Sequence, residues 1–158
     1  MTDVVVSVKG FQRDGIGDEE CMEFVTKGRR YQRDGTIYIT YDESELTGLE
    51  GTTTMLKIYA DHVVLVRTGI VRQHQEFRSG GRSCSTYSTP YGTMDMAVVT
   101  RHLSTSDHDG RMDIYIVYDL EIEKCWQSSN RLAITIREEK KKDGYETVAG
   151  GGHCQGRQ

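Results

Sequence analysis

Proline and helix-forming patterns are almost absent from this sequence. Pro90 is the only proline in 158 residues. No stretch repeats apolar residues at the three- and four-residue spacing of an amphipathic helix, and no heptads occur. The apolar runs fall far short of the roughly 20 residues that a membrane-spanning helix needs. These absences argue against a helix bundle, a coiled coil and a helical membrane protein, so we expect no membrane partner.

Signatures of catalysis and of metal binding are also missing. The four cysteines are scattered without a Cys-x-x-Cys pair, and no His-Glu-x-x-His motif occurs. We therefore expect no bound metal and no other cofactor. There is no Gly-x-Ser-x-Gly elbow and no Gly-rich phosphate loop leading into a helix. An enzyme consequently ranks behind a binding module and an interaction protein.

The net charge, the N-terminal sequence and the cysteines indicate which partners and which cellular location to expect. The formal net charge of −4 gives no electrostatic reason to expect a nucleic acid partner. The chain starts with Met1-Thr2-Asp3 and runs straight into strand-like sequence, without the basic and apolar regions of a signal peptide. We therefore expect a cytoplasmic protein with four reduced thiols, at Cys21, Cys84, Cys125 and Cys154.

Strict alternation of apolar and polar residues is the strongest positive signal, and it is clearest from Met112 to Glu123. A period of two places the two sets on opposite faces of a strand, one dry and one wet. The same pattern recurs from Arg131 to Arg137. From these two strands we expect a buried set that comprises Ile114, Ile116, Leu120, Leu132, Ile134 and Ile136.

The whole chain reads as about ten short strands joined by brief turns. The expected strands are 3–12, 21–31, 36–43, 52–59, 62–68, 71–77, 83–88, 93–103, 111–123 and 131–137. Asp34-Gly35 and Asp109-Gly110 are typical of two-residue hairpin turns. Short turns favour an up-and-down meander, and closing a meander removes its exposed edges. We therefore predict an all-β, closed antiparallel up-and-down barrel of about 8–10 strands, with a β-sandwich as the second choice.

The domain organisation follows from where the alternation stops. One barrel domain is expected over residues 1–140. Beyond it, residues 141–158 are rich in glycine and offer little apolar surface to pack. We expect this tail to be disordered.

A series of short motifs resembles a known family. In order they are Tyr41-Asp42-Glu43-Ser44-Glu45, Thr47-Gly48-Leu49-Glu50-Gly51, Val66-Arg67-Thr68-Gly69, Tyr87-Ser88-Thr89-Pro90-Tyr91-Gly92 and Tyr118-Asp119-Leu120. Together they look like the motif series of the YwiB-like family of small bacterial β-barrel proteins. The resemblance implies a closed antiparallel barrel of the calycin or lipocalin type. It implies no activity, because that family is itself functionally uncharacterised.

The motifs contain one candidate polar site, made of Glu43, Arg67, Tyr87 and Tyr91. If these side chains converge at one mouth of the barrel, Arg67 can bind a carboxylate or a phosphate while the two tyrosines supply ring faces and hydroxyls. The structural alternative is an internal ion pair between Glu43 and Arg67, with the tyrosines closing the end of the barrel. The sequence leaves both readings open.

Two function classes follow from this site. The first is a non-catalytic barrel that binds a small, partly apolar or amphipathic molecule at one open end. Met94 and Met96, which share a strand face, favour it because flexible thioethers can line an adaptable cavity. The second is a structural or interaction protein with a filled barrel, which docks a protein partner or self-associates as a homo-oligomer. Tyr115 and Val117, on an otherwise polar strand face, motivate that alternative.

Overall fold

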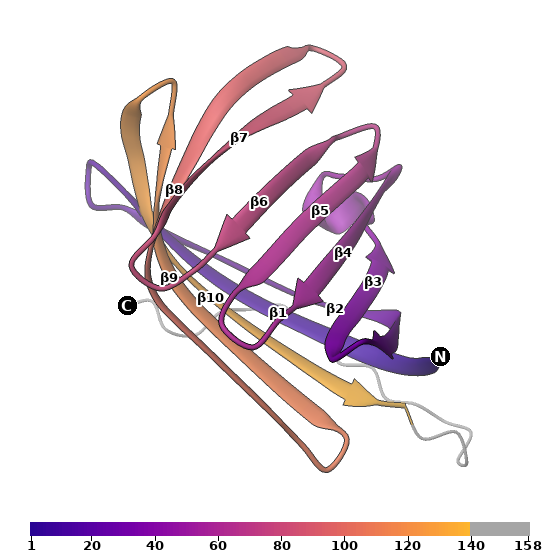
Figure 1. Ribbon diagram of the computed structural model, residues 1–158. Coiled ribbons are helices and arrows are strands. Elements are labelled where there is room, and N and C mark those ends of the chain that lie inside the picture. Colours follow the sequence, from indigo (N-terminus) through magenta and orange to yellow (C-terminus); the bar gives the residue numbers. More distant parts are fainter. Residues whose placement is uncertain (140–158) are drawn as a thin grey trace.

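The computed structural model describes residues 1–139 and is built from antiparallel strands (Figure 1). The strands are β1 (Thr2–Asp14), β2 (Glu19–Arg33), β3 (Thr36–Asp42), β4 (Thr52–Ile58), β5 (Val63–Gly69), β6 (Gln73–Phe77), β7 (Arg82–Thr89), β8 (Gly92–His108), β9 (Arg111–Ile122) and β10 (Cys125–Glu138). A single 3₁₀ turn, η1 (Glu45–Thr47), separates β3 from β4. The predicted tail at 141–158 lies outside the described residues.

The strands form one ten-stranded sheet in the order β6-β5-β4-β3-β2-β1-β10-β9-β8-β7. All neighbours but one are consecutive in sequence, as expected for an up-and-down meander. The exception is β1 with β10, which pair along their length from Val4 with Glu138 to Asp14 with Ser128. This long pairing joins the two ends of the meander and curls the sheet into a nearly closed barrel, so the predicted fold is confirmed. The remaining gap lies between β6 and β7.

The core follows from the alternation along the strands. Inward-facing aliphatic side chains from β1, β3, β4, β5, β9 and β10 form a single buried cluster. The prediction of burial is confirmed for Ile114, Ile116, Ile134 and Ile136. Leu120 and Leu132 pack against this cluster but stay half-buried, because they lie toward the end of the barrel where polar side chains replace the aliphatic ones.

Turn chemistry also agrees with the sequence. Asp34 and Asp109 have positive φ, as do the glycines that follow them, which is the conformation that type I′ hairpins require. Two strand boundaries were misplaced by five residues or more: β8 ends at His108 instead of residue 103, and β10 begins at Cys125 instead of residue 131. The first half of β10 carries the buried polar residues Ser128 and Asn130 on the inner face, and these interrupt the apolar alternation by which a strand is recognised.

Two glycines allow the β3–β4 loop to approach the end of β5. Gly69 has φ of +117°, and a Cβ there would lie 2.3 Å from the carbonyl oxygen of Gly51. That same carbonyl accepts a hydrogen bond of 3.2 Å from the backbone N–H of Ile70. A side chain at residue 69 would therefore break the contact that sets the relative position of the two segments.

Gly69→Ala should destabilise the protein by about 3 kcal/mol or more, because an unfavourable φ combines with a backbone clash. Gly35→Ala is the matched control, since Gly35 has φ of +82° but nothing within 4 Å of an added Cβ. It should cost only about 1–2 kcal/mol. Urea unfolding of both variants measures the difference. Equal losses would show that the clash at Gly69 is relieved by movement of the loop.

Candidate functional site

The turn that contains η1 lies at one end of the barrel (Figure 1), and polar side chains form a cluster in the interior beside it. Strand register explains why its members meet. Tyr41 on β3 lies opposite Thr54 on β4, and Thr54 lies opposite Arg67 on β5. Arg67 in turn lies opposite Gln73 on β6. Residues directly opposite each other share a face, so these four side chains form one inward-facing row.

Glu43, which follows β3, holds a carboxylate that is almost completely removed from solvent, with 2% of its side chain exposed. Its Oε2 accepts a 2.5 Å hydrogen bond from the hydroxyl of Thr54. Its Oε1 accepts a 2.8 Å hydrogen bond from the hydroxyl of Thr47 in η1. Both carboxylate oxygens are therefore satisfied by neutral donors, and the loop containing η1 is tied down over the end of the barrel.

Arg67 supplies the opposite charge but is only partly satisfied itself. Its Nε lies 3.9 Å from Oε2 of Glu43, which makes an ion pair too long for a hydrogen bond. Its Nη1 donates to the side-chain oxygen of Gln73 at 2.9 Å. Its Nε is buried and has no hydrogen-bond partner. A guanidinium carries five N–H donors, so this one retains donor capacity that faces the interior.

Tyr118 lies within electrostatic reach of Arg67 inside the barrel. Burial raises the pKa of Tyr118, and the positive charge of Arg67 opposes the rise. Its ring packs edge-on against Phe77 with centroids 5.2 Å apart. Tyr118 also lies directly opposite Thr100 on β8. The hydroxyl of Thr100, a residue with 1% exposure, is the second buried polar group without a hydrogen-bond partner within residues 1–139.

Within residues 1–139, Arg67 Nε and Thr100 Oγ1 are therefore the buried side-chain atoms that still lack a hydrogen-bond partner, which most buried polar atoms have. The two groups lie at different points of the interior: Arg67 is opposite Gln73 at the start of β6, whereas Thr100 bonds Gly80 and Gly81 after the end of β6. The hydroxyls of Thr47 and Thr54 both donate to the buried Glu43 carboxylate, which has 2% of its side chain exposed.

The predicted site residues are brought together only in part. Glu43 and Arg67 meet as the sequence suggested. Tyr87 is half-buried on β7 and lies opposite Met94, on the inner face, but no hydrogen bond or ring contact joins it to Glu43 or Arg67 among the described residues. Tyr91 is 97% exposed in the turn after β7, so its ring points into solvent and does not help to close the barrel.

Several polar residues of the barrel interior were not anticipated, namely Tyr41, Thr54, Gln73, Thr100 and Tyr118. Strand alternation could have found Thr54, because it occupies an inward position between Thr52 and Leu56. For Gln73 and Thr100, no alternation pattern in the sequence indicated an inward position. A polar residue at an inward position reads in a sequence as a break in the strand rather than as part of a site.

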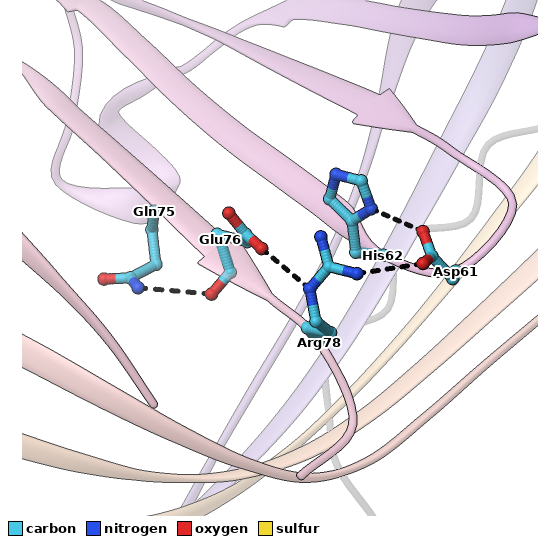
Figure 2. A network of polar contacts seen from close by, with 5 residues as sticks. All are labelled: Asp61, His62, Gln75, Glu76 and Arg78. Carbon is cyan, nitrogen blue, oxygen red and sulfur yellow. Dashed lines mark hydrogen bonds and ion pairs between the residues drawn. The ribbon is translucent and has the colours of Figure 1, made fainter. Parts of the chain in front are cut away.

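A second polar network lies at the other end of the barrel, where the β4–β5 turn meets the end of β6. Figure 2 shows Arg78 between two carboxylates: Nε is 3.0 Å from Glu76, and Nη1 is 2.9 Å from Asp61. Nδ1 of His62 lies 2.7 Å from the same Asp61. Glu76 and Asp61 raise the pKa of Arg78, and the hydrogen bond from His62 lowers that of Asp61. These groups are solvent-exposed and mutually paired, so they hold the turn in place and form no binding site.

The cysteine prediction is confirmed for Cys84 and Cys125, which are free and exposed. It is wrong for Cys21, which is not a free thiol, because spacing along the chain does not reveal which sulfurs meet in space. Cys154 lies outside the described residues. No group of three or more potential metal ligands occurs within residues 1–139. In the same residues, no helix has the length and apolar character to cross a membrane.

The family can be stated from the sequence itself. A family model described as "Domain of unknown function (DUF1934)" matches residues 6–134. The chain belongs to this family. Its match spans nearly all of the barrel and includes the motifs that form the polar cluster, so the resemblance drawn from those motifs is confirmed.

The relatives agree with this assignment. The chain is 25% identical to the "Uncharacterized beta-barrel protein YwiB" of Bacillus subtilis (strain 168) over 134 residues, which cover 85% of this chain and 92% of that protein. The crystal structure of the ywiB protein from Bacillus subtilis superimposes with a TM-score of 0.79 at 24% identity, covering 88% of this chain and 93% of the other. The likeness shows a shared fold and assigns no function.

Removing the charge of Arg67 should destabilise the fold through Glu43. Arg67→Met leaves a buried carboxylate without a counter-charge, which costs about 3–5 kcal/mol in fully buried pairs. We expect about 3 kcal/mol here, because two threonine hydroxyls still solvate Glu43. In a Glu43→Gln background the same substitution should cost about 1 kcal/mol. Urea unfolding of the four proteins gives the coupling, and additive losses would contradict an ion pair.

Alkaline pH should destabilise the protein through the buried tyrosines. Burial and the nearby Glu43 raise the pKa of Tyr41 above its ordinary value of 10.0, against an opposing effect of Arg67. Above about pH 10 the unfolded chain therefore loses a proton that the folded chain keeps, and the free energy of unfolding falls by up to about 1.4 kcal/mol per pH unit. Tyr41→Phe should flatten this fall in unfolding curves measured from pH 8 to pH 11. An unchanged slope would contradict the assignment; Tyr91→Phe is the control for removing a hydroxyl.

Proposed function

We propose that this protein is a non-catalytic barrel that binds a small, partly apolar molecule at the end of the barrel where Glu43 and Arg67 meet. The observation that carries the proposal is the buried, unpartnered Nε of Arg67 at this end; a second unpartnered atom, Oγ1 of Thr100, lies further along the interior, where the backbone of Thr100 bonds Gly80 and Gly81 after β6. Leaving such groups unpaired costs about 1–3 kcal/mol each. A binding protein can tolerate that loss, because a ligand group completes the hydrogen bonds.

The surrounding inner surface suits the apolar part of such a ligand. Toward this end of the barrel, several inward-facing apolar side chains are half-buried instead of buried. They include Phe24, Leu120 and Leu132 on the barrel wall and Met94 and Met96 on β8. Ligand sites of this kind combine an apolar wall with a few polar groups that fix orientation.

The interaction-protein alternative has weaker support on the outer face. Tyr115 is 39% exposed and Val25 is 44% exposed, but Val117 is half-buried. The strand positions between Tyr115 and Val25 carry polar residues such as Lys9 and Thr135. An interrupted apolar surface is a poor docking face for a protein partner or for a second copy of the chain.

Binding can be tested with a neutral fluorescent probe, N-phenylnaphthylamine, and with dodecanol as a competitor that carries one hydroxyl. We expect saturable probe fluorescence that dodecanol reverses. Native mass spectrometry of the purified protein would show a retained ligand directly. Absence of probe binding, together with self-association in size-exclusion chromatography with light scattering, would overturn the proposal in favour of the interaction protein.

Thr100→Val separates binding from stability. Because the hydroxyl of Thr100 has no partner, its removal should leave the stability of the free protein unchanged or raise it by about 1 kcal/mol. The affinity for dodecanol should fall about five-fold with the loss of one hydrogen bond. Thr54→Val is the matched control: its hydroxyl binds the Glu43 carboxylate, so we expect a loss of about 2 kcal/mol in stability. Destabilisation by Thr100→Val would contradict the role assigned to this hydroxyl.

A further inference from the structure

The gap between β6 and β7 is the one incomplete part of the described barrel wall. These consecutive strands share a single bridge, between Arg72 and Ser88, whose backbones exchange two hydrogen bonds of 3.0 Å. Toward the other end, the side chain of Gln75 stands between the strands. Its Nε2 donates to the carbonyl of Ser83, and its Oε1 accepts from the hydroxyl of Ser85. The strands are therefore pinned at two points and left apart between them.

A shallow groove of about 560 Å³ that is open to solvent lies at this gap. Arg67, Gln73 and Ser85 line it from the inner face, where Arg67 lies opposite Gln73 and Ser85 binds the buried Gln75. Exposed side chains of the outer face line it as well, namely Arg72, His74 and Thr86. Side chains of the inner face and of the outer face can border the same groove only where the two neighbouring strands are not hydrogen-bonded to each other. The groove thus connects solvent with Arg67.

The lining is cationic and has unused donors. It holds two arginines and a histidine, with no carboxylate among the lining residues. Most arginines of the described chain pair with a carboxylate, but the exposed side chain of Arg72 has no ion pair and no hydrogen bond within residues 1–139. Arg67 keeps its unpartnered Nε. Two carboxylates neighbour lining residues: Glu43, which pairs with Arg67 at 3.9 Å, and Asp95, which lies opposite Thr86 on β8.

We infer that the molecule bound by this barrel carries an anionic head group, a carboxylate or a phosphate, which sits in the β6–β7 groove between Arg67 and Arg72. This inference rests on the proposed function and names the chemistry of its ligand. Guanidinium groups present paired N–H donors that match the oxygens of either anion. The apolar part of the ligand passes inward from Arg67, toward the half-buried side chains of the barrel wall.

Head-group selectivity provides the test. Displacement of N-phenylnaphthylamine is compared for dodecanoate, dodecyl phosphate, dodecanol and dodecyltrimethylammonium, which share one chain length. We expect one or both anions to bind about ten-fold more tightly than dodecanol, and the cation to bind more weakly than dodecanol. The preferred anion identifies the head group. Added salt should reduce this preference, because the groove is open to solvent.

Arg72→Gln should abolish the preference for the anion over dodecanol, because Arg72 supplies positive charge to the head-group site. Arg33→Gln is the matched control, since Arg33 is also exposed and without an ion pair but lies at the end of β2, remote from the groove. It should leave both affinities unchanged. Equal binding of the four compounds, or equal effects of the two variants, would overturn the anionic head group while the binding function stands. Failure of every compound and of the probe would overturn the proposed function instead.

Discussion

The buried carboxylate of Glu43 is the group on which one end of this barrel depends. A charge removed from water must be solvated by protein groups, and here the donors come from three separate segments: η1, β4 and β5. Thr47 and Thr54 bind the two oxygens directly, and Arg67 balances the charge at longer range. The same requirement positions the β3–β4 loop, and the close approach of Gly51 to Gly69 allows that loop to reach its place.

The second feature that shapes this barrel is the position of the gap between β6 and β7. Pairing between β1 and β10 is continuous, although these strands are the most distant in sequence, whereas β6 and β7 are consecutive and hardly pair. Edge strands left unpaired are prone to associate with other chains. In this barrel the two edges face each other, joined by the bridge at Arg72 and by the side chain of Gln75, so the unpaired length is short and lies beside a cationic groove.

The candidate site lies where the polar cluster around Glu43 adjoins the gap between β6 and β7. Arg67 belongs both to the polar cluster around Glu43 and to the lining of the β6–β7 groove. Its Nη1 binds Gln73 on the edge strand, which leaves Nε facing the interior. The guanidinium of Arg67 therefore balances the charge of Glu43 and still has an Nε–H group without a hydrogen-bond partner. The internal ion pair and the binding site, which were alternatives at the level of sequence, are compatible in the structure.

Local patterns alone determined the strands, the two Asp-Gly hairpins and most of the aliphatic core, because alternation and turn chemistry depend on neighbours in the chain. The motifs that carry the family resemblance brought Glu43 and Arg67 forward as a candidate pair. Other features depend on strand register around the barrel, and the tertiary structure alone decided them. They are the inward positions of Thr100 and Asn130, the start of β10 at Cys125, the exposure of Tyr91 to solvent and the location of the gap between β6 and β7. Register between strands is set by contacts among residues far apart in sequence, and a polar residue facing inward looks, in one dimension, like the end of a strand.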